Sequence, residues 1–152
     1  EDCLALCAEL GLTAHARAQE GEPETRTQVF LAELGEDTGL WYRLAALAYM
    51  GGSLTSGDVP NPMVAAALGS AVVHGSKIGQ NQYAYNRLRE AGATQPLETS
   101  QDLSQRVSAL MEPDQCAEMA AAGWEVVSEG AEVTDRLVAI TLQKLGLGEV
   151  AQ

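Results

Sequence analysis

Residue types able to carry out catalytic chemistry are sparse in this sequence and form no familiar motif. The chain has 152 residues, with two histidines, three cysteines and 21 acidic side chains. It contains no phosphate-binding loop, dinucleotide fingerprint, paired-histidine metal motif or nucleophile elbow. A serine–histidine or cysteine–histidine site would have to use His15 or His74. The sequence therefore predicts a protein that is not an enzyme, with an unrecognised carboxylate or histidine site as an alternative.

His74 is the histidine whose neighbours suggest binding chemistry. On a helix, Ala71, Ser70 and Ala67 would precede it at three, four and seven residues and form a flat strip of small side chains. A neutral imidazole above such a strip could supply an axial ligand to the metal of a large planar group, directly or through a water molecule. The alternative is a histidine satisfied within the core. His15 lies in a more polar stretch, where a solvated role is expected.

Composition and charge limit the classes of partner. The 46% hydrophobic share includes 24 alanines and a single phenylalanine, so bulky side chains are scarce for a core of normal density. Either close helix packing or a bound ligand could account for this. The net charge of −12 argues against nucleic acid as a partner. No apolar run has the length of a membrane span. The first residue, Glu1, is typical of a chain whose targeting segment has been removed.

The three cysteines do not predict a disulfide framework. Cys3 and Cys7 are four residues apart, which places both on one face of a helix where a bridge would be strained. Too few soft ligands lie nearby in the sequence for a metal site. We expect Cys3, Cys7 and Cys116 to be free thiols.

The chain reads as helices separated by short breaks, without alternating strand patterns. Asn61 followed by Pro62, Thr99 with Asp102, and Pro113 are typical helix starts. We therefore expect an all-α fold with about eight helices, in one domain over residues 1–152 that encloses a ligand cavity. The expected helices cover residues 4–18, 25–34, 38–50, 63–78, 80–91, 100–110, 113–128 and 132–145.

The order of three segments carries a resemblance to a known family. The segments are Leu44-Ala45-Ala46-Leu47-Ala48-Tyr49-Met50-Gly51, Val73-His74-Gly75-Ser76-Lys77-Ile78-Gly79 and Arg106-Val107-Ser108-Ala109-Leu110-Met111-Glu112-Pro113. An alanine-rich stretch to Val127 follows. This order resembles one repeat unit of the peridinin–chlorophyll a proteins of dinoflagellates, which are soluble light-harvesting antennae of the thylakoid lumen. Their all-helical units have about this length.

The resemblance implies that the chain binds peridinin and chlorophyll a, with a bound lipid as a further candidate, and passes excitation energy towards a photosystem. His74 would hold the chlorophyll magnesium through a water molecule. The remaining expected contacts with the pigments are Ala71, Ser70, Ala67, Met50, Tyr49 and Trp124. Ordinary core packing is the alternative for the aromatic side chains among them.

The resemblance also implies a place and partners. The chain would lie in the chloroplast thylakoid lumen after removal of a targeting peptide, with a membrane antenna or photosystem as energy acceptor. A single unit would leave an apolar cavity side exposed, so we expect a symmetric homodimer. The second interpretation of the whole sequence is a helical protein–protein interaction module without a cofactor.

Overall fold

The computed structural model describes residues 3–17, 23–32, 35, 37–55 and 58–146, and it divides the chain into two compact units. Unit 1 covers residues 1–38 and unit 2 covers residues 39–152. Unit 1 contains helix α1 (Cys3–Glu9) and the parallel strands β1 (Ala14–Ala16) and β2 (Val29–Leu31). The expectation of a single domain over 1–152 stays a prediction.

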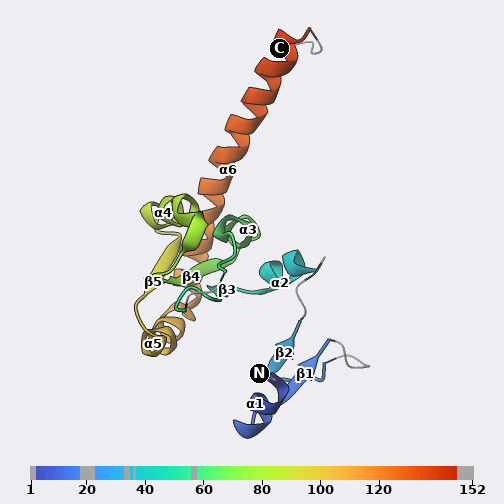
Figure 1. The fold of residues 1–152 in the computed structure, drawn as a ribbon, viewed down its shortest axis with the longest axis vertical. Helices are drawn as coiled ribbons and strands as arrows, with labels where there is room; N and C mark the ends of the chain where they lie inside the picture. Colours follow the sequence, from blue (N-terminus) through green and yellow to red (C-terminus); the bar gives the residue numbers. More distant parts are fainter. Residues whose placement is uncertain (1–2, 18–22, 33–34, 36, 56–57, 147–152) are drawn as a thin grey trace. The chain divides into compact units, whose positions relative to one another are not determined.

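Unit 2 holds most of the chain and a three-stranded parallel sheet in the order β3-β4-β5 (Figure 1). The strands are β3 (Leu47–Met50), β4 (Ala71–Gly75) and β5 (Thr94–Leu97). The helices are α2 (Thr38–Leu44), α3 (Pro62–Ala67), α4 (Gln82–Glu90), α5 (Ser100–Leu110) and α6 (Pro113–Lys144), with the short 3-10 helix η1 (Gly79–Asn81) before α4.

The central strand β4 is buried along its whole length, because helices cover both of its faces. On one face, Val73 packs with Leu97, Leu110 and Met119, which brings α5 and α6 against the sheet. On the other face lies the side chain of Val72, within the core cluster Ala48, Met50, Ala65, Val72 and Tyr85, which draws on α3 and α4. The sequence of a strand that is buried on both faces is a short apolar run, without alternation of apolar and polar residues.

The expectation of an all-α fold with about eight helices is wrong. The described residues form six α-helices and five strands in parallel sheets. The expected helix over 63–78 is instead α3, a turn at Gly69 with φ +92°, and β4. A fully buried strand and a buried helix give the same apolar run, and the alanines of this segment favour the helix in a reading of local sequence.

Three other predicted helices were also partly or wholly wrong. The described part of 4–18, which ends at residue 17, contains α1 and then β1; the described part of 25–34 contains β2, and residues 38–50 contain α2 and then β3. Leu34, the expected end of the second helix, lies outside the described residues. The predicted break at Gly130 is absent, because α6 continues through that position to Lys144.

The predicted helix starts and free thiols were more accurate. The side chain of Asn61 accepts a hydrogen bond from the amide of Met63, and Pro62 begins α3. Thr99 and Asp102 form the expected capping box of α5, and Pro113 begins α6. Cys3, Cys7 and Cys116 are free. These features depend on two to four adjacent residues, so the local sequence is sufficient to predict them.

Candidate functional site

The carboxyl ends of β3 and β4 lie side by side and lead into two loops. β3 ends at Met50 beside His74, and the turn of residues 51–55 follows it. β4 ends at Gly75 and is followed by residues 76–78. In open parallel sheets, ligands bind in the crevice outside the carboxyl ends of the strands. We therefore call the turn 51–55 and the segment 75–78 the carboxyl-end site.

Ser53 joins the two loops of the carboxyl-end site. Its hydroxyl donates a hydrogen bond to the carbonyl oxygen of Met50 at 2.5 Å and accepts one from the amide of Gly75 at 2.7 Å. Its carbonyl oxygen accepts a third bond, from the amide of Lys77 at 2.9 Å. Ser53 is completely buried. These bonds hold the two loops in a fixed relative position.

Gly75 is required by the closeness of these two loops. A Cβ atom at this position would lie 2.3 Å from the carbonyl oxygen of Ser53 and 2.7 Å from the amide nitrogen of Leu54. Both atoms belong to the backbone and cannot rotate away. Gly52, in the turn after β3, has φ +81°, a left-handed conformation that glycine adopts without steric cost. The glycines therefore allow a tight approach of backbone to backbone.

His74 lies directly before Gly75, with a side chain that is 3% exposed. Its Nδ1 lies 2.6 Å from the carbonyl oxygen of Gly75, an acceptor, so Nδ1 carries the proton. Nε2 is then an acceptor and has no hydrogen-bond partner within the described part of the chain. Burial lowers the pKa of His74; the bond to Gly75 acts in the opposite direction, and the charge of Arg89 lowers the pKa further. The imidazole is therefore held neutral.

Two residues from η1 and α4 hold the loop before α3, and one of them also packs against the imidazole of His74. The hydroxyl of Tyr85 donates to the carbonyl oxygen of Pro60 at 3.0 Å, and its ring centroid lies 4.5 Å from that of His74. The side-chain amide of Asn81 donates to the carbonyl oxygen of Val59 at 2.9 Å. Burial raises the pKa of Tyr85, so its hydroxyl keeps the proton that this bond needs. These contacts hold the loop before α3 against η1 and α4.

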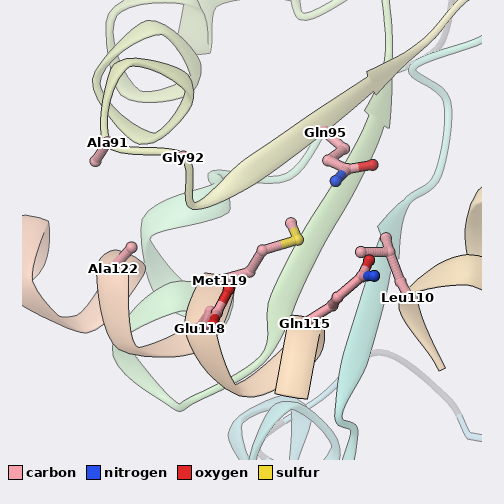
Figure 2. A pocket seen from close by; sticks show the side chains of 8 residues that line it. All are labelled: Ala91, Gly92, Gln95, Leu110, Gln115, Glu118, Met119 and Ala122. Carbon is pink, nitrogen blue, oxygen red and sulfur yellow. The ribbon is translucent and has the colours of Figure 1, made fainter. Parts of the chain in front are cut away.

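A hollow of about 550 Å³ lies at the amino end of β5 (Figure 2). Its walls come from the end of α4, from β5, from the end of α5 and from the first turns of α6; they are Ala91, Gly92, Gln95, Leu110, Gln115, Glu118, Met119 and Ala122. Figure 2 shows the thioether of Met119 extending towards β5. Apart from one carboxylate and two amides, its lining residues carry no polar side chain. The carboxyl-end site has the stronger case, because two strand ends and a buried hydrogen-bond network converge there.

The residues predicted from the sequence as ligand contacts do not share one helical strip. Ala67 ends α3, Ala71 and His74 belong to β4, and Tyr49 and Met50 belong to β3. The hydroxyl of Ser70 lies 2.6 Å from the carbonyl oxygen of Tyr42 and 2.9 Å from that of Ala45, which anchors the start of β4. Trp124 lies on α6 with 59% of its surface exposed. Contact of these residues with a ligand stays a prediction.

The sequence reasoning missed Ser53, Gly75 and Lys77 as parts of one site. It assigned Gly51-Gly52 to a helix end and residues 53–62 to a loop, and it placed Gly75 within a helix. The available signal was the adjacent pair Val72-Val73, whose β-branched side chains favour a strand. A strand there would have placed a glycine-containing turn after it, which is a typical binding position in parallel sheets.

Comparison with known proteins gives an informative similarity. The chain resembles the solved structure of the C-terminal CMP-Kdo binding domain of WaaA from Acinetobacter baumannii, with a TM-score of 0.73 and 26% sequence identity. The match covers 82% of this chain and 65% of that domain, so the chain spans about two thirds of the domain's length. No family model matches the chain.

This similarity, together with the parallel α/β fold, contradicts the light-harvesting interpretation. The expected peridinin, chlorophyll a and lipid ligands are wrong, because the matched domain binds a nucleotide sugar. The transfer of excitation energy and the cofactor-free interaction module are contradicted too, whereas a ligand-binding role of His74 and a partner complex stay predictions. The predicted absence of enzymatic function is contradicted as well. The thylakoid-lumen location is also wrong, because the matched domain comes from a bacterium. The resemblance rested on short segments that were expected to be helical, but the segments around Met50 and His74 form strands.

The described residues contain neither a cluster of metal ligands nor a membrane-spanning helix. No group of three or more histidine, cysteine, aspartate or glutamate side chains there could hold a metal ion. None of the helices in that part of the chain is both long enough and apolar enough to span a bilayer. The expected homodimer and the absence of a nucleic-acid partner stay predictions.

Proposed function

We propose that this chain binds a CMP-linked sugar of the CMP-Kdo type and forms the sugar-nucleotide-binding part of a glycosyltransferase. The observation that carries the proposal is the similarity to a CMP-Kdo binding domain over 82% of the chain, at 26% identity. The fold supports it independently, because parallel strands with helices on both faces bind nucleotides at their carboxyl ends.

The geometry of the carboxyl-end site suits a nucleotide. Gly75 lets the two turns meet closely, and Gly51 has no atom within 4 Å of the position of a Cβ, so a ligand can approach the backbone of Gly51 closely. The bonds made by Ser53 fix the turns before the ligand arrives, which lowers the conformational cost of binding.

The chemistry of such a ligand is glycosyl transfer. The bond between the anomeric carbon of the sugar and the phosphate oxygen breaks, CMP leaves, and the sugar is joined to an acceptor hydroxyl. In this proposal unit 2 supplies binding and orientation of the donor. Orientation alone can provide a large part of the rate acceleration of a two-substrate reaction.

Nuclear magnetic resonance titration tests both binding and location. The 152-residue chain is titrated with CMP-Kdo, CMP, UMP and AMP while backbone amide shifts are recorded. We expect the cytidine nucleotides to bind most tightly and to shift the amides of Gly51, Gly52, Ser53 and Ser76. The amides of Gln115 and Glu118, in the hollow at the amino end of β5, serve as the internal control and should stay in place.

Two outcomes contradict the proposal. The first is that no nucleotide shifts any amide at millimolar concentration. The second is that the shifts occur only in the hollow at the amino end of β5, which would move the ligand to the other end of the sheet.

A further inference from the structure

Lys77 is the cationic side chain held closest in sequence to the end of the central strand. It follows the last residue of β4, Gly75, by two positions. Its amide donates a hydrogen bond to the carbonyl oxygen of Ser53 at 2.9 Å, so its backbone belongs to the fixed junction between the two loops. Its side chain is exposed. The structure therefore combines a fixed attachment point with a charged group free to reach a ligand.

The ammonium group of Lys77 has no carboxylate partner in the described part of the chain. The ion pairs found there join Arg17 to Asp37, Arg26 to Glu24 and Arg87 to Glu129. Asp102, in the first turn of α5 after the neighbouring strand β5, is an acidic group that already has hydrogen-bond partners. Its carboxylate accepts hydrogen bonds from the amide and the hydroxyl of Thr99. Lys77 therefore keeps its three N–H donors available.

The overall charge makes a local cation favourable for the binding of an anionic ligand. The chain carries 21 acidic and nine basic side chains, a net charge of −12, and repels anions at long range. A CMP-linked sugar acid carries two kinds of anionic oxygen group, a phosphate and a carboxylate. A positive charge at the carboxyl ends of β3 and β4 would offset this repulsion.

We infer that Lys77 binds an anionic oxygen group of the sugar nucleotide and so determines selectivity for the charged form of the ligand. The inference rests on the proposed function, since it concerns the same site. The ammonium acts as a point charge and does not demand the two-fold geometry of an arginine, so it can serve a phosphate or a carboxylate oxygen.

Calorimetric titration with three probes tests this assignment. Cytidine, CMP and CMP-Kdo are titrated into the wild-type chain and into Lys77→Ala, Lys77→Arg and Lys144→Ala. Lys144 is a matched control, because it is an exposed lysine in the last turn of α6 and its removal changes the net charge equally. Thermal melts accompany each titration, and Lys77→Ala should melt close to the wild type because the side chain is exposed.

We expect Lys77→Ala to weaken CMP about tenfold while cytidine binding is unchanged, since one charge-assisted hydrogen bond is lost. Lys77→Arg should restore most of the affinity, and Lys144→Ala should bind like the wild type. A loss confined to CMP-Kdo, with CMP unaffected, supports the inference and identifies the carboxylate as the bound group. A loss of affinity for both CMP and CMP-Kdo, with cytidine unaffected, identifies the phosphate as the bound group.

Other results overturn the inference. If Lys77→Ala binds all three probes like the wild type, or weakens cytidine as much as CMP, Lys77 does not bind an anionic group. A Lys144→Ala variant that loses as much affinity as Lys77→Ala shows that net charge alone is responsible. A wild-type chain that binds none of the probes overturns the proposed function together with this inference, whereas binding without a lysine effect overturns the inference alone.

Discussion

The carboxyl end of the sheet and the distal half of α6 differ in what holds each residue in place. At the carboxyl end, Ser53 is completely buried and joins two loops by two hydrogen bonds, from the amides of Gly75 and Lys77. Along α6, Val126 is 8% exposed, whereas Val133 and Leu137, closer to the end of the helix, are 60% and 59% exposed. Figure 1 shows that the second half of α6 continues past the sheet.

This difference shows that apolar sequence and buried position are separate properties. The distal half of α6 carries exposed apolar side chains, including Val133, Leu137 and Ile140, and its helical bonds are internal to the segment. The carboxyl end is rich in glycine and serine, yet it is closely packed. Substitutions at glycines of the two regions should therefore have opposite effects.

The largest effect is expected for Gly75→Ala. The new Cβ would lie 2.3 Å from the carbonyl oxygen of Ser53, so the two loops must move apart. We expect a loss of about 3 kcal/mol in the free energy of unfolding, typical of severe overpacking. Urea unfolding followed by circular dichroism measures it. Gly51→Ala is the control, since its Cβ would have no atom within 4 Å and should change stability by less than about 0.5 kcal/mol.

If Gly75→Ala and Gly51→Ala unfold at the same urea concentration, the two loops are not as closely packed as the structure shows. That result would also remove the argument that the carboxyl-end site is fixed before ligand binds.

A smaller effect of opposite sign is expected for Gly130→Ala. Gly130 lies inside α6, and a Cβ there would have no atom within 4 Å. We expect a gain of about 0.5–1 kcal/mol in stability, because alanine loses less backbone entropy in a helix. The same urea experiment measures it, together with helical ellipticity at low denaturant.

Gly146→Ala provides the contrast for this prediction. Gly146 follows the end of α6 with φ +69°, a conformation that penalises a Cβ atom, so this variant should lose stability. If Gly130→Ala also loses stability, α6 does not continue through residue 130 as one helix.

The smallest effect expected is a pH dependence that comes from His74. Burial lowers the folded-state pKa of His74 below its ordinary value of 6.5. Between these two pKa values the unfolded chain binds more protons, so the stability of the wild type should fall as the pH falls below about 6.5 and should be insensitive to His74 above it. Thermal melts from pH 5 to 8 measure this dependence.

His74→Phe keeps a ring against Tyr85 but cannot be protonated, so its melts should lose this part of the slope. His15→Gln is the control and should keep it. An identical slope in the wild type and His74→Phe would show that His74 titrates alike in the folded and unfolded chain.

Features that depend on residues close together in the sequence could be predicted, whereas features that depend on distant segments could not. Asn61, Thr99 with Asp102, and Pro113 were read correctly as helix starts, because a cap is formed by residues within one turn. The segments around β3 and β4 were read as helices. Their alanine content favours a helix locally, and the partners that make them strands lie more than 20 residues away.

The candidate site shows the same division. His74 was singled out from sequence as unusual, and it is buried and neutral within the structure, although the planar ligand inferred for it was wrong. Ser53 and Gly75 could not be associated from sequence, because they are 22 residues apart and meet only where β3 and β4 end together.

The sequence by itself determined the caps, the free thiols, the strong negative charge and the scarcity of bulky apolar side chains. The tertiary structure alone decided which apolar runs became strands and which loops met at the sheet's carboxyl end. The physical reason is that a parallel strand obtains its hydrogen bonds from distant segments, so its identity depends on the pairing of the whole sheet and not on its own residues.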